Sequence, residues 1–145
     1  MSEWQSEVLV PAVRAGLLVE LRAKTMLCTT PLSLWGGLDP KTGEVIDRRH
    51  PQSGLNLSGQ VVFLPFGRGS SSASSILLES VKLGTAPAAF VLTDADGILA
   101  LGAAVARELY QASPAILVLG EEAWQAASQS HEVEIDRSGL IRALG

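Results

Sequence analysis

The residues best suited to chemistry lie in one glycine- and serine-rich stretch near the middle of the chain. An apolar run over 61–64 stops at Pro65, and after one more residue come Gly67, Arg68, Gly69, Ser70, Ser71 and Ser72. Glycines let a backbone approach a ligand closely, and the unpaired N–H groups at a helix start attract anions. With the fixed charge of Arg68, such a loop could hold a carboxylate or a phosphate. The pattern leaves a second interpretation open, in which the glycines and serines only form a turn and a helix cap.

Ser70 is the hydroxyl best placed to react, because it lies at the expected junction of loop and helix. A serine alkoxide is costly near neutral pH, but backbone N–H groups, the helix start and Arg68 would each stabilise it. Ser70 is therefore a candidate base or nucleophile, with a capping serine as the alternative. The stretch lacks the lysine of a Walker loop, the third glycine of a dinucleotide fingerprint and the flanking glycines of a nucleophile elbow.

Other polar and aromatic residues are weaker candidates. The segment Trp35, Gly36 and Gly37 could shape a pocket wall, or could be a core tryptophan beside a turn. Four residues in polar loops before the glycine-rich stretch are more typical of turns and surfaces: Asp39, Asp47, Arg48 and His50.

Two further aspartates, Asp94 and Asp96, follow a predicted strand, at the end where α/β sheets bind ligands. Helix capping is the simpler explanation for both of them. His131 heads a predicted edge strand and is expected to be solvated. The sequence contains no recognisable Ser/His/Asp constellation and no metal-ligand spacing.

The elements that would position these residues follow from hydrophobic patterning. The first half reads as mostly β, with strands at 15–23, 27–30, 45–47 and 60–64. After the glycine-rich stretch, helices at 71–83, 98–109 and 120–127 alternate with strands at 88–92 and 115–118, and an edge strand follows at 131–136. Strands alternating with helices predict parallel pairing and right-handed crossovers. We therefore expect an α/β fold, β-rich in the first half, in a single domain over 1–145 with 1–14 as a loose leader.

Composition limits the classes of function. The chain has 145 residues, 47% of them hydrophobic, and a net charge of −4, which argues against nucleic acid as a main partner. Cys28 is the only cysteine, so the chain cannot hold an iron–sulfur cluster with its own thiolates alone. The N-terminus is polar and acidic, and no apolar run approaches the ~20 residues that span a membrane, so we expect a cytoplasmic protein.

Several of these segments together resemble the swivel domain of the aconitase X family. The resemblance rests on the segment from Trp35 to Asp47, on His50 and Pro51, on Gly54, and on the glycine-rich stretch from Gly67 to Ser72. It covers roughly residues 15 to 140 in unbroken order. It implies a swivelling β/β/α domain that forms the small subunit of a hydro-lyase. A large subunit as partner would carry the iron–sulfur cluster, and this chain would bind no metal.

The resemblance also implies roles for individual residues. By similarity to the wider aconitase superfamily, Ser70 would be the catalytic base. Substrate-binding residues would be Gly67, Arg68, Gly69, Ser71, Ser72, Trp35, Gly36 and Gly37. Arg68 and the loop N–H groups would stabilise charge on the substrate carboxylate, with the partner's metal as Lewis acid for the departing hydroxyl. Closure of the swivel domain would exclude water.

The family includes dehydratases of two hydroxy acids, cis-3-hydroxy-L-proline and mevalonate 5-phosphate. Loops associated with the second activity carry threonine after the first serine, whereas this chain has Ser71 and Ser72, which favours hydroxyproline. Two alternatives remain open: a swivel subunit that has lost catalysis and serves only in assembly, and a free-standing module that binds small molecules.

Overall fold

The computed structural model describes residues 2–65 and 72–145. Ten strands and three helices are assigned in this part of the chain. The strands are β1 (Glu3–Gln5), β2 (Glu7–Val10), β3 (Val13–Arg14), β4 (Leu17–Leu18), β5 (Leu21–Leu27), β6 (Val61–Leu64), β7 (Ala89–Leu92), β8 (Ala115–Val118), β9 (Glu132–Ile135) and β10 (Leu140–Ala143). The helices are α1 (Ser72–Leu83), α2 (Gly97–Tyr110) and α3 (Glu121–Ala127).

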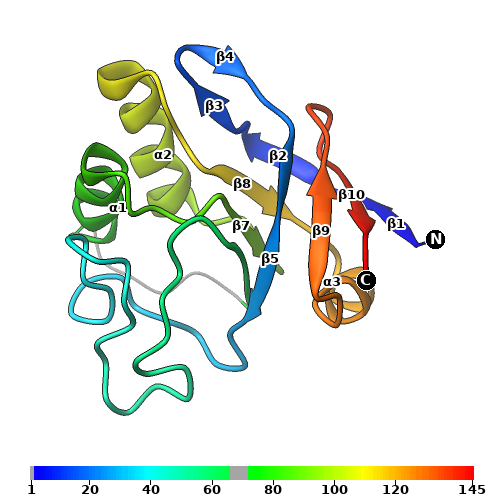
Figure 1. Cartoon of the computed structure of the whole chain (residues 1–145), viewed down its shortest axis with the longest axis horizontal. Helices are drawn as coiled ribbons and strands as arrows, with labels where there is room; N and C mark the ends of the chain where they lie inside the picture. The colour runs from blue at the N-terminus through cyan, green and yellow to red at the C-terminus, as the bar shows by residue number, and fades with distance from the viewer. Residues whose placement is uncertain (1, 66–71) are drawn as a thin grey trace.

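Eight strands form one sheet in the order β1-β10-β9-β5-β6-β7-β8-β2. The pairs from β5 through β8 are parallel, and the remaining pairs are antiparallel. β1 and β2 lie at opposite edges of this sheet, yet only Ser6 separates them in the chain. The sheet must therefore curl until its two edges meet at Ser6, as the course of the chain in Figure 1 shows.

The parallel strands are buried on both faces, and alternate residues enter different cores. Val61, Phe63 and Val91 face the inside of the curled sheet, where Val133, Ile135 and Ile141 also lie. Val62, Phe90 and Ile116 face α1 and α2, together with Leu77, Leu99 and Ala103. The result is a layer of antiparallel strands, a layer of parallel strands and a layer of helices, which confirms the expected β/β/α architecture.

The two helices of the outer layer cross closely. A Cβ atom built on Gly102 of α2 would lie 2.9 Å from the Cα atom of Ser74 of α1. α2 begins at a cap, because the Asp96 carboxylate accepts hydrogen bonds from the N–H groups of Ile98 and Leu99, both at 3.0 Å. The predicted capping role of Asp96 is confirmed.

The N-terminal segment differs from what the sequence predicted. Residues 3–14 are not a loose leader, because β1 pairs with β10, β2 pairs with β8, and β3 pairs with β4. Its charged and polar side chains are exposed at the sheet edges, so its pattern resembles that of an unstructured tail. The strand expected at 15–23 is likewise divided, because the β3–β4 turn falls at Ala15 and Gly16, both with positive φ.

Three more of the strands expected from the sequence differ in the structure. No separate strand forms at 27–30, because Leu27 ends β5. The strand expected at 45–47 is reduced to isolated bridges, such as Leu38 with Val45. β9 is not an edge strand: it lies between β5 and β10, and the sequence analysis had not predicted β10.

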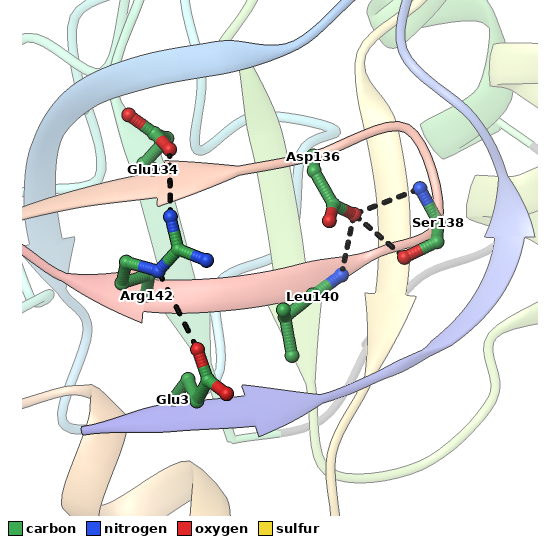
Figure 2. Close-up of polar contacts among 6 residues, drawn as sticks. All are labelled: Glu3, Glu134, Asp136, Ser138, Leu140 and Arg142. Carbon is green, nitrogen blue, oxygen red and sulfur yellow. Dashed lines mark hydrogen bonds and ion pairs between the residues drawn. The ribbon is translucent and has the colours of Figure 1, made fainter. Parts of the chain in front are cut away.

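Polar contacts join the antiparallel strands β1, β9 and β10 at their exposed side. Figure 2 shows Arg142 of β10 between Glu134 of β9 and Glu3 of β1, at 3.3 and 3.4 Å. In the turn between β9 and β10, the carboxylate of Asp136 accepts three hydrogen bonds, from Ser138 Oγ, Ser138 N and Leu140 N. These contacts fix the turn that brings residue 139 against the N-terminal segment.

Candidate functional site

The carboxyl ends of the four parallel strands lie side by side at one end of the molecule. Backbone hydrogen bonds continue past the last strand residues: Cys28 N donates to Phe63 O at 2.9 Å, and Thr93 N donates to Pro65 O at 3.2 Å. Leu119 N donates to Leu92 O at 2.9 Å. The residues that follow the strands are thus held in a fixed order across this edge of the sheet.

A pocket of about 580 Å³ opens at these strand ends. Its described walls consist of Leu27, Thr29, Pro65, Thr93, Asp94, Glu121, Trp124 and Gln125. Trp124 is buried, donates from Nε1 to Val91 O at 2.8 Å, and meets the ring of Phe63 edge-on with centroids 6.0 Å apart. A rigid apolar base thus carries a rim of hydroxyl, amide and carboxylate groups, which is a common composition for a small-molecule site.

The pocket lies where the chain changes sides of the sheet. After β7 the chain forms α2, which packs with α1 on the outer face, whereas after β8 it forms α3 on the other side, below β9 and β10 in Figure 1. In open α/β sheets, ligands bind in the crevice that such divergent connections leave at the carboxyl ends of neighbouring strands. The topology therefore supports ligand binding at this pocket independently of its composition.

Most of the residues predicted to do chemistry lie outside the described part of the chain. This applies to Gly67, Arg68, Gly69, Ser70 and Ser71, so their roles stay predictions. Ser72 begins α1, as the expected order of strand, glycine loop and helix requires. Pro65, the residue that follows β6, lines the pocket.

The segment Trp35, Gly36 and Gly37 forms an ordered turn. Trp35 is 63% exposed, so it is not the core tryptophan that was one of the two interpretations. Gly37 N and Leu38 N both donate to Leu34 O, and a Cβ on Gly37 would lie 2.1 Å from the carbonyl oxygen of Ser33. The turn therefore requires glycine at position 37. The described walls of the pocket do not include Trp35, so its role in substrate binding stays a prediction.

His50 has a structural role that the sequence analysis missed. It is buried, its Nδ1 accepts from Gln52 N at 3.1 Å, and its Nε2 lies 3.1 Å from Thr30 O. Because Nδ1 accepts, the proton lies on Nε2, which donates to Thr30. His50 thereby fixes the backbone next to Thr29 of the pocket. Asp39 and Asp47 behave as expected for turn residues, accepting from Lys41 N and Arg49 N.

The structure separates the two aspartates that follow β7. Asp96 caps α2, whereas Asp94 lines the pocket. The sequence analysis did not single out five other wall residues, namely Thr29, Thr93, Glu121, Trp124 and Gln125. Three of them, Thr29, Thr93 and Glu121, lie within three residues of a strand end, and that position was the signal available in the sequence.

The described residues do not fit an iron–sulfur cluster. No three His, Cys, Asp or Glu side chains within 2–65 and 72–145 are grouped so that they could hold a metal ion. Cys28 is fully buried, and burial raises the pKa of its thiol to about 12, so it stays protonated and cannot serve as a thiolate ligand. None of the helices in these two ranges is long and apolar enough to cross a membrane.

Comparison with known proteins decides the family. The sequence profile of the aconitase X swivel domain matches residues 13–143. The chain belongs to the aconitase X swivel-domain family. A crystal structure of Thermococcus kodakaraensis aconitase X in its holo-form shares the fold of this swivel domain, with a TM-score of 0.81, 22% identity and full coverage of both chains.

Two relatives of this swivel domain differ in length. A cis-3-hydroxy-L-proline dehydratase of Pseudomonas aeruginosa is 55% identical over 92 residues, which are 63% of this chain and 16% of that protein. A phosphomevalonate dehydratase small subunit of Methanothermobacter thermautotrophicus is 38% identical over 122 residues, which are 83% of this chain and 89% of that protein. The chain thus spans a small part of the first protein and most of the second.

Proposed function

We propose that this chain is the small subunit of a two-chain dehydratase of the aconitase X family, acting on cis-3-hydroxy-L-proline. The observation that carries the proposal is its 55% identity to a protein named for that activity, against 38% for the phosphomevalonate dehydratase small subunit. The chain spans only 16% of the hydroxyproline relative, and in this proposal a partner chain supplies the remainder of the enzyme. That partner is the large subunit.

The large subunit would also hold the iron–sulfur cluster. The single cysteine of this chain is buried, with a raised pKa, and the described residues contain no group of metal ligands. This chain would contribute the base and part of the substrate site. Both would lie at the carboxyl ends of the parallel strands, where the pocket opens and where the glycine-rich stretch leaves β6.

In the proposed dehydration, residues of this chain would remove a proton from the substrate and stabilise the charge that develops on it. Ser70, as an alkoxide, would take the proton from the carbon next to the carboxylate. Arg68 and the loop N–H groups would stabilise the negative charge that develops on the carboxylate. The electron pair of the broken C–H bond forms the double bond as the C–O bond of the neighbouring carbon breaks. The products are one water and pyrroline-2-carboxylate.

A second candidate is dehydration of mevalonate 5-phosphate. Its supporting observation is length, because the chain covers 89% of the small subunit of Methanothermobacter thermautotrophicus but only 16% of the Pseudomonas protein. A non-catalytic swivel subunit that serves in assembly is the third candidate. The three predict different results when the chain is combined with its large subunit.

The test is reconstitution. We expect the chain alone to bind no iron and show no activity, and its mixture with the large subunit to convert cis-3-hydroxy-L-proline to pyrroline-2-carboxylate, measured by mass spectrometry. Turnover of mevalonate 5-phosphate alone would favour the second candidate. A large subunit that is equally active without this chain would leave only the assembly role.

A further inference from the structure

Asp94 differs from the other aspartates in its hydrogen bonding to the described part of the chain. The chain has five aspartates, and four of them accept hydrogen bonds from backbone N–H groups of their own turn or helix start: Asp39, Asp47, Asp96 and Asp136. Asp94 accepts none and forms no ion pair with the rest of the described chain, and it lines the pocket instead. Turn formation and capping, which explain the other four, therefore do not explain Asp94.

The backbone on both sides of Asp94 is held in place. Thr93 N donates to Pro65 O at 3.2 Å on the β6 side, and Leu119 N donates to Leu92 O at 2.9 Å on the β8 side. On its C-terminal side, Asp96 is fixed as the cap of α2. The Asp94 carboxylate thus projects from a rigid segment at the point where α2 and α3 diverge from the sheet. A carboxylate in this position is preorganised for a ligand in the pocket.

The charge of the pocket restricts the ligand. Its described walls contain two carboxylates, Asp94 and Glu121, and no Lys, Arg or His. Mevalonate 5-phosphate is anionic at both ends, so either end would meet like charge at this rim. A cyclic amino acid carries one carboxylate and one ring ammonium. The ammonium is attracted to the rim and its N–H groups can donate to a carboxylate.

We propose that Asp94 binds the ring ammonium of a cyclic amino-acid substrate, which makes it a specificity-determining residue for hydroxyproline over phosphorylated hydroxy acids. This inference rests on the proposed function, whose site it deepens. Asp94 is exposed in the isolated chain, where water weakens its attraction for a cation. A large subunit that covers the pocket removes that water, so the contact gains strength in the assembled enzyme.

The test compares two five-membered rings that differ at one atom. L-Proline has a ring ammonium, whereas tetrahydrofuran-2-carboxylate of the same hand has an uncharged oxygen in its place. Their affinities for the complex with the large subunit are measured by calorimetry, for wild type, for Asp94→Asn and for the control Glu122→Gln. Glu122 is an exposed carboxylate beside Glu121, and it is not part of the described pocket wall.

We expect wild type and Glu122→Gln to bind L-proline about tenfold more tightly than the oxygen ring, the usual worth of a hydrogen bond to a charged group. Asp94→Asn should bind both rings with equal affinity. Equal affinities in wild type, no measurable binding of L-proline, or a preference that survives in Asp94→Asn would each overturn the proposal. Displacement of L-proline by an equal concentration of mevalonate 5-phosphate would also overturn it.

Turnover of cis-3-hydroxy-L-proline by the same samples separates the two proposals. A complex that prefers L-proline through Asp94 but does not dehydrate cis-3-hydroxy-L-proline supports the ammonium site and refutes the proposed reaction. A complex that dehydrates the substrate with an unchanged preference in Asp94→Asn overturns the ammonium site and leaves the reaction intact.

Discussion

Ser6 and Gly139 join the two edges of the curled sheet. Both the amide and the hydroxyl of Ser6 donate to the carbonyl oxygen of Gly139, at 3.2 and 2.7 Å. Ser6 is the single residue between β1 and β2, and Gly139 lies in the turn between β9 and β10. This contact therefore joins the antiparallel and parallel layers a second time, in addition to the pairing of β5 with both β9 and β6.

Gly139→Ala is expected to be strongly destabilising. Its φ of +88° disfavours any side chain, and a Cβ would lie 2.4 Å from Val8 Cγ2 and 2.7 Å from Ser6 Oγ. We expect a loss of about 2–4 kcal/mol in the free energy of unfolding, measured by urea denaturation. Gly84→Ala is the matched control, with a φ of +75° and open space around its Cβ, and should lose about 1 kcal/mol. Equal losses in the two variants would contradict the account of this junction.

The turn carboxylate Asp136 gives stability a dependence on pH. Hydrogen bonds from Ser138 Oγ and from two backbone N–H groups lower the pKa of Asp136 below its usual value. Because the folded pKa is the lower one, the contribution is complete above about pH 5 and is lost as pH falls through 4 and below. Asp136→Asn should thus lose stability relative to wild type at pH 7, and the difference should shrink towards pH 3.

Urea denaturation between pH 3 and pH 7 checks this prediction. Ser138→Ala is the control, because it removes the hydroxyl donor that contributes most to the lowered pKa of Asp136. The pH dependence of its stability should be weaker than that of wild type. A wild-type advantage over Asp136→Asn that stays constant across the range would contradict the role of the carboxylate charge.

Cys28 is expected to be inert in the folded chain. Burial raises the pKa of its thiol to about 12, so almost none of the reactive thiolate is present at pH 8. Alkylation by iodoacetamide, followed by mass spectrometry, should proceed only as fast as the chain unfolds, and should become fast in urea. Rapid modification of the native chain would show that the thiol is accessible.

Trp35 is expected to contribute to substrate binding in the assembled enzyme and not to the stability of the folded chain. Because its side chain is 63% exposed, Trp35→Ala should change the free energy of unfolding by no more than about 0.5 kcal/mol. If it lines the substrate site of the assembled enzyme, the variant should raise KM. Leu17→Ala is the control, since Leu17 is 70% exposed and lies in the β3–β4 hairpin. An unchanged KM in Trp35→Ala would remove Trp35 from the substrate site.

The elements that the sequence predicted well are strands in which almost every residue is buried. β7 and β8 are apolar on both faces because α1 and α2 cover one side and the curled sheet covers the other. Their runs therefore stand out without knowledge of their neighbours. The cap at Asp96 is equally local, since it needs only the carboxylate and the N–H groups of the next two or three residues.

The missed elements depend on partners far away in the chain. β1 is exposed or half-buried and becomes a strand only because β10, more than 130 residues later, pairs with it. Without β10, β9 was interpreted as an edge strand. The pocket depends in the same way on the register of four strand ends. Asp94 and Asp96 look alike in sequence, and only their three-dimensional placement separates a pocket residue from a cap.

Ser70→Ala in the reconstituted complex tests the central claim most directly. With the chain as the source of the base, we expect the rate of cis-3-hydroxy-L-proline dehydration to fall at least ~10²–10⁴-fold, with complex formation and melting temperature unchanged. Ser71→Ala, which removes the adjacent hydroxyl that we expect to bind substrate, should lower the rate far less than Ser70→Ala does. Near-normal turnover in Ser70→Ala together with a lowered melting temperature would contradict the account and leave Ser70 as a helix cap.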